Sequence, residues 1–340
     1  MITTPDVQEL IADTEAEIRK LLDESEDERT RELYEMVRYH MGLDGEARSA
    51  GKRIRPLLGL LAYMSLAGDY RAALPGAVAV ELGHNFSLVH DDIEDRDVER
   101  RHRPALWTVY GLAQAINTGD ALFALSRVVV HRLTDHGFPD DKILRLLRIY
   151  DETCLDLCEG QFIDIWMSEH DERMTVDAYF DMIGRKTASL IAGAVEAGAV
   201  LATEDQQVAA AYRSIGWALG IAFQLNDDLL GIWGQEHATG KKASDLAKHK
   251  KTLPVIYALE HAGPEDRERL RELYAGPSTS PADVDEIRAI LERAGARDYT
   301  RAEARRYRDE ALTALQQANV ADGAAREQLR LIIVSAISAD

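Results

Sequence analysis

The segment ELGHNFSLVHDDIEDRDVERRHRPALW, residues 81–107, ends an apolar helical run in a cluster of carboxylates. Asp91 and Asp95 are four residues apart, so on a helix they share one face, with Asp92 and Glu94 beside them. Like charges at this spacing repel, and Mg²⁺ offsets the repulsion because it takes carboxylate and phosphate oxygens as ligands. The segment therefore predicts a metal site. A solvated acidic helix end is the alternative, and the apolar flank LGHNFSLVH argues against it.

A second acidic pair, Asp227 and Asp228, closes the apolar run AFQLNDDLLGIWG. This run belongs to residues 205–232, which are apolar on most sides and predict a buried helix. Carboxylates at the edge of a core are costly without a partner. We therefore expect the two acidic helix ends to face each other across a cavity.

Basic residues gather at four places in a chain whose net charge is −19. They are Arg100 and Arg101; Lys52, Arg53 and Arg55 in GKRIRP (51–56); Arg185 and Lys186 in GRKT (184–187); and Lys241, Lys242, Lys248, Lys250 and Lys251 in the loop 235–252. The GRKT segment stands at an expected helix start, where the dipole and free N–H groups favour anions. Together these cations predict a site for polyphosphates. For the lysine-rich loop alone, a solvated surface is the alternative.

Composition excludes several other classes of protein. The charge of −19 over 340 residues argues against a general nucleic-acid binder, which needs a basic face. We expect no signal peptide, and no apolar run approaches the about 20 residues of a membrane span. The only cysteines, Cys154 and Cys158, lie four apart on an expected helix, where a disulfide has the wrong geometry. We expect two buried, reduced thiols and a cytoplasmic protein.

Apolar residues recur at helical spacing almost throughout, and no sustained stretch alternates β-branched with polar residues. The predicted fold class is therefore all-α, a single domain over residues 1–340 without strands. The expected helices cover residues 6–24, 27–42, 56–67, 72–95, 105–116, 119–136, 140–169, 175–183, 185–201, 205–232, 254–262, 265–275, 281–294, 298–319 and 323–337.

Six segments in this order resemble the polyprenyl synthetase family of trans-isoprenyl diphosphate synthases. They are GKRIRP (51–56), ELGHNFSLVHDDIEDRDVERRHRP (81–104), EGQFID (159–164), KTASL (186–190), FQLNDDLLGIWG (223–234) and TGKKASDLAKHKKTLP (239–254), within a motif-bearing core of about 45–262. The resemblance implies a helical bundle around a central cavity, assembled as a homodimer. It also implies head-to-tail prenyl transfer, in which an allylic diphosphate ionises and isopentenyl diphosphate attacks the carbocation.

The resemblance assigns roles to the residues that match its motifs. Asp91, Asp95 and Asp227 would bind Mg²⁺, about three ions per site, with Asp92 in support. The allylic diphosphate would contact Arg100, Lys186, Thr187, Gln224, Lys241 and Lys250. Isopentenyl diphosphate would be held without metal by Lys52, Arg55, His84 and Arg101. The catalytic set would be Asp91, Asp92, Asp95, Arg100, Lys186, Asp227 and Lys241.

One position departs from the family pattern. The second acidic motif is often DDxxD, whereas here Gly231 takes the place of the last acid and offers no side chain to a metal. Asp227, whose position carries the closest metal contact in such sites, is present, so we expect activity to survive.

Phe86 lies five residues before Asp91, about 7.5 Å deeper along a helix that rises 1.5 Å per residue. An aromatic residue there, beside the small Ser87, resembles geranylgeranyl diphosphate synthases and predicts a C20 product. Packing in the core is the alternative role for Phe86, and C15 and C25 products stay open. Two other functions stay open as well. A terpene cyclase on the same fold needs no isopentenyl diphosphate site, and a regulatory subunit of a heteromeric synthase needs no acidic motif.

Overall fold

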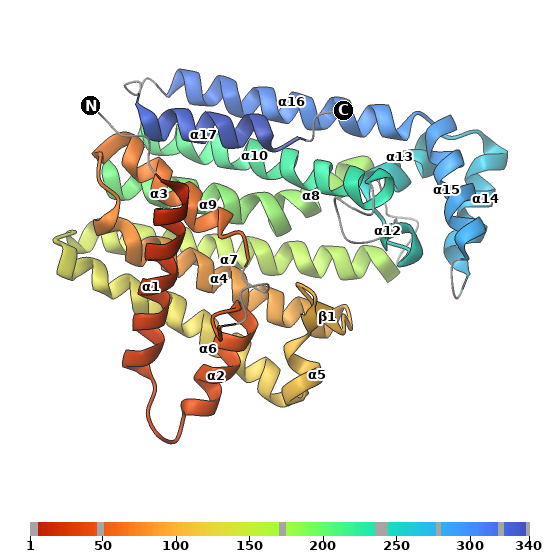
Figure 1. Ribbon diagram of the computed structural model, residues 1–340. Helices are drawn as coiled ribbons and strands as arrows, with labels where there is room; N and C mark the ends of the chain where they lie inside the picture. The colour runs from red at the N-terminus through yellow and green to blue at the C-terminus, as the bar shows by residue number, and fades with distance from the viewer. Residues whose placement is uncertain are drawn as a thin grey trace. The chain divides into compact units, whose positions relative to one another are not determined.

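The described part of the chain is helical almost throughout, so the predicted all-α fold class is confirmed (Figure 1). The computed structural model describes residues 6–45, 51–169, 175–234, 244–276, 280–318 and 323–337. The α-helices are α1 (Val7–Ser25), α2 (Arg31–Met41), α3 (Ile54–Ala67), α4 (Leu74–Glu94), α5 (Leu106–Tyr110), α6 (Leu112–Val128), α7 (Asp140–Glu169), α8 (Val176–Ile183), α9 (Ser189–Ala202), α10 (Gln206–Trp233), α12 (Ser244–Ala247), α13 (Leu253–His261), α14 (Pro264–Ala275), α15 (Pro281–Arg293), α16 (Ala296–Gln317) and α17 (Ala324–Ser335). Tighter or wider turns are η1 (Arg71–Ala73), η2 (Val129–His136) and the π-turn η4 (Gly184–Ala188).

Several helix ends follow directly from local sequence. The Asp6 carboxylate accepts a hydrogen bond from the backbone N–H of Gln8 (2.9 Å) and caps α1. Ser280 and Asp283 form a reciprocal capping box at the start of α15. Helix α2 ends at Gly42, whose φ of 68° is easy only for glycine. At these three helix ends the expected boundary lies within one residue of the observed one. The helix expected at 119–136 instead begins at Leu112, and its last part is the tighter turn η2.

The expectations about secondary structure fail at two places between residues 99 and 116. The helix expected at 105–116 breaks at Gly111, whose φ of 84° ends α5 and lets α6 begin in a new direction. The prediction of no strands fails because Glu99–Arg100 (β1) and Arg103–Pro104 (β2) pair as a small antiparallel hairpin. Strands of two residues are too short to show alternation in a sequence.

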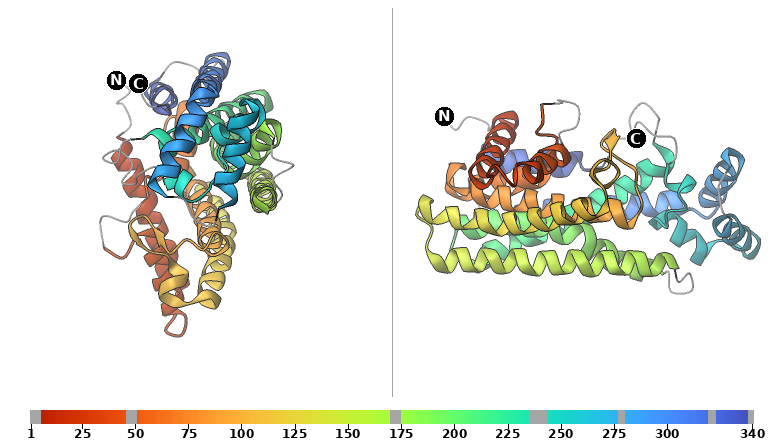
Figure 2. Two further views of the ribbon diagram at one scale, coloured as in Figure 1. Left: turned by 90° about the vertical axis from the view of Figure 1, so that its right-hand side faces the viewer. Right: turned by 90° about the horizontal axis from the view of Figure 1, so that it is seen from below.

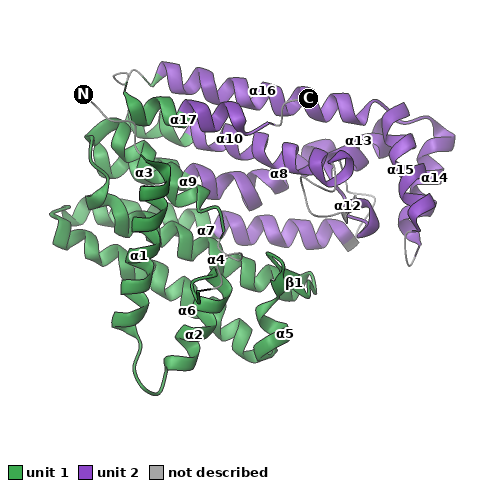
Figure 3. Cartoon of the chain, in the orientation of Figure 1, with its two compact units in different colours: residues 1–154, 193–213, 318–329 green, residues 155–192, 214–317, 330–340 purple. Residues whose placement is uncertain are grey.

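The chain divides into two compact units (Figure 3). Unit 1 comprises residues 1–154, 193–213 and 318–329, and unit 2 comprises residues 155–192, 214–317 and 330–340. Each unit is thus assembled from three separate stretches of chain. The single domain over 1–340 stays a prediction.

Unit 1 is built on α4, which contacts α1, α3 and α6. Helices α4 and α6 lie side by side in every view (Figures 1 and 2). Leu82, Phe86 and Val89 of α4 are all buried, because the helix is apolar on nearly every side until its last turn. The apolar burial holds the polar last turn, and therefore the acidic residues, in one place.

Unit 2 has two apolar clusters. One gathers α8, α10 and α13 around residues such as Tyr179, Leu225 and Leu253. The other includes Ile232 at the end of α10 and Leu246 of α12. Since both clusters use α10, apolar packing holds this helix in place near its C-terminal end.

The prediction of two buried thiols is wrong. Cys154 is half-buried and Cys158 is exposed on α7, although both are reduced. A four-residue spacing puts two side chains on one face of a helix, and it does not say whether that face is covered. Among the described helices, none is both long enough and apolar enough to cross a membrane.

Candidate functional site

The last turn of α4 presents two of the predicted metal ligands. Asp91 and Asp95 stand one turn apart, and the Asp95 N–H donates to the Asp91 carbonyl oxygen (2.8 Å). Asp91 is half-buried and Asp95 is exposed. Arg96 then adopts a φ of 55° and the Asp97 N–H bonds the Asp92 carbonyl (2.9 Å), which closes the helix in a Schellman turn. The carboxylates therefore sit at a sharp helix end, as the sequence predicted.

Asp92, between them, points the other way. Its side chain is 1% exposed, and Oδ1 accepts from both Nε (2.7 Å) and Nη2 (2.6 Å) of Arg100. Oδ2 is buried without a hydrogen-bond partner among the described residues. Burial raises the pKa of the Asp92 carboxyl, and the bonds from Arg100 oppose that shift. Asp92 thus holds the guanidinium of Arg100, and the supporting role expected for Asp92 stays a prediction.

The β1–β2 hairpin places the arginine pair. Arg101 and His102 form its two-residue turn, with φ values of 52° and 61°. Two positive φ values define a type I′ turn, for which Asn-Gly is the favoured sequence. Non-glycine residues in this conformation cost of order 1 kcal/mol each and are enriched at functional sites. The turn separates Arg100, bound to Asp92, from Arg101.

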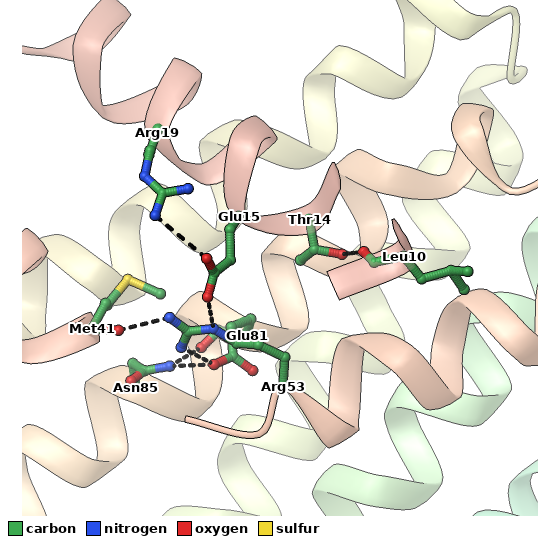
Figure 4. A network of polar contacts seen from close by, with 8 residues as sticks. All are labelled: Leu10, Thr14, Glu15, Arg19, Met41, Arg53, Glu81 and Asn85. Carbon is green, nitrogen blue, oxygen red and sulfur yellow. Dashed lines mark hydrogen bonds and ion pairs between the residues drawn. The ribbon is translucent and has the colours of Figure 1, made fainter. Parts of the chain in front are cut away.

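Of the three basic residues in GKRIRP, Arg53 belongs to the core (Figure 4). It is 2% exposed and its guanidinium bonds Glu81 Oε1 (2.7 Å), Glu15 Oε1 (3.2 Å) and the Met41 carbonyl (2.6 Å). Asn85 donates a further bond to Glu81 Oε1 (3.0 Å). Because these partners come from α1, α2 and α4, Arg53 fastens three helices together beneath the site.

The four residues predicted to hold isopentenyl diphosphate, Lys52, Arg55, His84 and Arg101, all belong to unit 1. Nη1 of Arg55 lies 3.0 Å from Nε2 of His84. A Cβ on Gly51 would lie 2.9 Å from Nη2 of Arg101, so the segment carrying Lys52 reaches the arginine turn. Lys52 itself is exposed.

Arg55, His84 and Arg101 are half-buried, and their hydrogen-bonding groups are only partly satisfied. Burial lowers the pKa of Arg55 to about 10, and burial together with nearby Arg55 lowers the pKa of His84 well below its usual range. A neutral His84 therefore accepts from Arg55. Nε of Arg55 and Nη1 of Arg101 are buried and lack hydrogen-bond partners among the described residues. Buried donors without partners are rare, so this cluster is suited to an anion.

The two carboxylates of the second acidic pair differ in exposure. Asp227 is exposed near the end of α10, whereas Asp228 is 2% exposed. Asp228 accepts from the Tyr179 hydroxyl, the Leu253 N–H (3.1 Å) and Nε2 of Gln224 (3.1 Å). Burial raises the pKa of Asp228 to about 7. Asp228 is therefore a structural anchor, and Asp227 is the carboxylate presented outward.

Gly231, the departure from the family motif, has a steric reason. A Cβ at this position would lie 1.9 Å from Oδ2 of Asp245. Gly231 follows Asp227 by one helical turn, so the two share a face of α10. The Asp245 carboxylate thus lies where the side chain of the motif's last acid would begin. Nζ of Lys250 lies 3.9 Å from this carboxylate.

Gly231→Ala is expected to lower the free energy of unfolding by about 1–3 kcal/mol, because the added methyl group overlaps Asp245. Urea denaturation measures the change. Gly83→Ala is the matched control, since a Cβ at that helical glycine meets nothing within 4 Å. Combining Gly231→Ala with Asp245→Ala should recover most of the loss; equal stability of the single variant and the wild type would show that the contact is wrong.

The segment GRKT does not start a helix, contrary to expectation. It forms the π-turn η4 inside a continuous helical stretch from α8 to α9, and the Ser189 N–H bonds the Gly184 carbonyl. Such turns often occur at functional sites. Nζ of Lys186 bonds Asp164 (2.6 Å) and the Thr187 hydroxyl donates to Oε1 of Gln224 (2.9 Å).

Thr187, Gln224 and Asp228 thus form one chain of hydrogen bonds in unit 2. In the lysine-rich loop, Lys241 lies outside the described residues. Lys251 bonds the Ser168 carbonyl (3.1 Å) at the end of α7, so it has a structural contact.

Phe86 is 7% exposed and packs edge-on against Phe123 of α6, with ring centroids 5.2 Å apart. Its other aromatic neighbour is His90, at 5.9 Å. Ser87 is buried, and its hydroxyl bonds the His84 carbonyl (2.9 Å). Phe86 lies deeper in α4 than the acids, as its spacing predicted.

The donor chemistry suits Mg²⁺. Asp91, Asp95 and Asp227 offer carboxylate oxygens that are not fully buried. Among the described residues, no three potential ligands gather into a complete metal site. Mg²⁺ usually takes only one or two carboxylates and completes its shell with water and phosphate oxygens. The residues therefore fit an ion that arrives together with a diphosphate.

A match to the family model for polyprenyl synthetase covers residues 31–292. The chain belongs to the polyprenyl synthetase family. The geranylgeranyl diphosphate synthase of Mycobacterium tuberculosis (strain ATCC 25618 / H37Rv) is 41% identical over 270 residues, 77% of this chain and 75% of the relative. The (2E,6E)-farnesyl diphosphate synthase of the same strain is 38% identical over 301 residues, 86% of this chain and 82% of the relative.

A solved polyprenyl synthase from Caulobacter crescentus CB15, complexed with calcium and isoprenyl diphosphate, has the same fold. Its TM-score is 0.81 at 30% identity, covering 98% of each chain. Together with the named relatives, these matches make this polyprenyl synthetase a prenyltransferase.

The sequence did not predict which residues contact the site residues and hold them in place. Tyr179 bonds Asp228 from 49 residues away in the chain, and Asp245, within the predicted segment 239–254, lies against Gly231. The pairing of Asp92 with Arg100 depends on the hairpin, which has no sequence signal. The one signal in the sequence is Gly231 itself. A glycine where the family motif has an acid indicates that another side chain, here Asp245, occupies the position of the missing one.

Proposed function

We propose that this polyprenyl synthetase condenses isopentenyl diphosphate with an allylic diphosphate, head to tail, in an Mg²⁺-dependent reaction. The observation that carries the proposal is the pair of sites in unit 1. The carboxylates Asp91 and Asp95 close α4, and the half-buried residues Arg55, His84 and Arg101 form a cluster that is cationic through its two arginines. The reaction has two diphosphate substrates. One needs a site that binds it through metal, and the other needs a site that binds it without metal.

Asp91, Asp95 and Asp227 would hold Mg²⁺, which supplies positive charge to the leaving diphosphate when bound. Lys186, held by Asp164, and Arg100, held by Asp92, add preoriented donors for the same group. Arg55, Arg101 and exposed Lys52 would hold the second diphosphate. No side chain need act as a nucleophile, because the double bond of isopentenyl diphosphate supplies the electron pair.

Water has to be kept from the carbocation, or it is quenched to an alcohol. Apolar α4 serves this purpose, since Phe86 and Val89 are buried directly below its acidic end. The central cavity expected for the family would hold the growing chain beside this helix.

The experiment that tests the function is product analysis of the purified protein. It is incubated with Mg²⁺, isopentenyl diphosphate and each of the C5, C10 and C15 allylic diphosphates. We expect elongation by whole C5 units that EDTA abolishes. A hydrocarbon from geranylgeranyl diphosphate alone would indicate a terpene cyclase, and no turnover by the purified chain would indicate a regulatory subunit.

For product length we propose C20, with C15 and C25 as the alternatives. The support is Phe86, buried one and a half turns below Asp91 and braced by Phe123. Relatives in the family include both farnesyl and geranylgeranyl diphosphate synthases, so the family alone leaves the length open.

Phe86→Ala is expected to lengthen the main product by at least one C5 unit, because removing the ring opens space along α4. Chromatography of the dephosphorylated products measures the change. Phe138→Ala is the control, since Phe138 packs against Tyr63 of α3, with ring centroids 6.2 Å apart. An unchanged product distribution in Phe86→Ala would leave Phe86 as a core residue only.

We also propose a homodimer, formed through α6. Leu112 and Ile116 lie one turn apart on the same face of this helix and are 52% and 43% exposed. Val109 and Tyr110 of α5 extend the exposed apolar surface. Such a contiguous surface marks an interaction site. A cytoplasmic location is proposed on the two reduced cysteines at a spacing unsuited to a disulfide.

Replacing Leu112 and Ile116 by Asp is expected to convert the dimer to a monomer, because two charges would have to be buried without partners. Light scattering after size-exclusion chromatography measures the mass. Leu331→Asp is the control, since Leu331 is equally exposed (45%) on α17. A wild-type monomer, or a dimer that persists in the double variant, would contradict this interface.

A further inference from the structure

His40, near the end of α2, has a ring nitrogen that forms no hydrogen bond with the described residues. Its side chain is 7% exposed and Nε2 is buried without a hydrogen-bond partner among the described residues. The ring also bonds the backbone carbonyl of Asn85, which leaves Nδ1 as the nitrogen that donates. This bond fixes the orientation of the ring and leaves Nε2 available for a ligand. Buried polar atoms in this condition call for an explanation.

His40 lines a pocket in unit 1 together with Arg100, Arg101 and Arg103. The three arginines differ in how far they are neutralised. Arg100 is bound to Asp92, and Arg103 is bound to Asp44 (2.7 Å) while covering the ring of Tyr39. Arg101 has a buried Nη1 without a partner in the described chain. The uncompensated charge next to His40 is therefore that of Arg101.

The same arginine joins this pocket to the cationic cluster assigned above to isopentenyl diphosphate. The charged and titratable groups around the His40 ring are Arg53 and Arg55 at the start of α3, Glu81 and His84 of α4, and Arg100, Arg101 and Arg103 of the hairpin. Glu81 is bound to Arg53. His40 therefore faces a net positive surface.

Burial, followed by the charges of Arg101 and Arg100, lowers the pKa of His40 well below its usual range. The imidazole is thus neutral in the ligand-free protein, and Nε2 carries a lone pair. A diphosphate in the cluster reverses the sign of the local field, which favours the imidazolium. A protonated Nε2 is a hydrogen-bond donor to a phosphate oxygen, and hydrogen bonds between ions are strong.

We propose that His40 is a further ligand of isopentenyl diphosphate, which it contacts through Nε2 after taking up one proton from solvent as the diphosphate binds. This inference rests on the proposed function, since it adds a residue to the metal-free diphosphate site. It assigns a role to a residue outside the segments that resemble the family. No bond other than N–H is formed or broken in the step.

Two variants separate binding from structure. His40→Asn places an amide near Nδ1, keeping the bond to the Asn85 carbonyl and removing Nε2. His40→Gln reaches the position of Nε2, where its amide N–H donates to phosphate without protonation, and loses the bond to Asn85. A residue with only a structural role would tolerate the first change better than the second. A diphosphate ligand shows the opposite order in affinity.

Calorimetry of the full chain with isopentenyl diphosphate at pH 8, in buffers of different ionisation enthalpy, gives affinity and protons together. The wild type is expected to take up about one proton per ligand, because phosphate groups of pKa about 6 are already ionised there. His40→Asn should lose this uptake and about tenfold or more in affinity, with an unchanged unfolding midpoint. His40→Gln should keep affinity within about threefold, without proton uptake and with a lower midpoint.

Steady-state kinetics supply the second readout, with a raised KM for isopentenyl diphosphate and an unchanged kcat in His40→Asn. If the wild type binds isopentenyl diphosphate and transfers prenyl groups while His40→Asn matches it in affinity and proton uptake, the role of His40 is wrong and the proposed function stands. If the wild type neither binds isopentenyl diphosphate nor transfers prenyl groups, the proposed function itself is wrong.

Discussion

Asp91→Asn is expected to lower kcat for prenyl transfer by about a thousandfold or more, because it removes a charged ligand from the ion that stabilises the departing diphosphate. Asp91 is half-buried at the end of α4, so the apolar helix holds its carboxylate in place and neighbouring acids cannot move into its position. Initial rates with isopentenyl diphosphate and an allylic diphosphate, at saturating Mg²⁺, measure the loss.

Glu94→Gln is the matched control. Glu94 is an exposed acid in the same helical turn, outside the pair formed by Asp91 and Asp95. Its replacement is expected to change kcat less than about threefold, since an exposed charge that binds no ligand interacts only weakly through water. Circular dichroism establishes that both variants fold. A folded Asp91→Asn protein with near-normal kcat would remove the acidic end of α4 from the reaction.

Arg53→Ala is expected to lower the free energy of unfolding by about 3–5 kcal/mol, the largest stability loss we predict. The substitution leaves Glu81, 2% exposed, as a buried carboxylate without its guanidinium, and it releases the Met41 carbonyl. Burying an unpaired charge is far more costly than losing a surface ion pair. Urea denaturation monitored by tryptophan fluorescence measures the change.

Lys52→Ala is the matched control, because Lys52 is the adjacent basic residue and is exposed. We expect it to leave the stability within about 0.5 kcal/mol of the wild type. Its KM for isopentenyl diphosphate should rise instead. Similar stabilities of Arg53→Ala and Lys52→Ala would contradict the division of GKRIRP into a structural arginine and a substrate-facing lysine.

The helices could be predicted from sequence because their signals are local. The apolar spacing of α4 and the proline at the start of α15 act within a few residues of the positions they determine. The carboxylates Asp91 and Asp95 could be placed for the same reason, since a four-residue spacing fixes a shared face.

The parts that could not be predicted depend on contacts between distant segments. Nothing near Arg53 indicates that Glu15 and Glu81 bury it, and nothing near Asp228 indicates Tyr179. The π-turn at GRKT was mistaken for a helix start because Lys and Arg beside a glycine are compatible with both. Exposure of Cys158 was missed because spacing specifies a face and leaves its covering open.

The relation between the two acidic motifs stays a prediction, since Asp91 belongs to unit 1 and Asp227 to unit 2. Steady-state kinetics of the double variant, Asp91→Asn combined with Asp227→Asn, test whether the two motifs act together. If both carboxylates serve one metal cluster, the double variant should lose less transition-state stabilisation than the sum of the losses in the two single variants. The first substitution already disables the cluster, so the second has little left to remove.

Head-to-tail prenyl transfer is tested most directly by a single turnover with radiolabelled isopentenyl diphosphate and unlabelled farnesyl diphosphate in the presence of Mg²⁺. The label is expected in a C20 diphosphate, one C5 unit longer than the primer, with one diphosphate released per labelled product. Labelled isopentenyl diphosphate recovered unchanged while farnesyl diphosphate is consumed would contradict prenyl transfer.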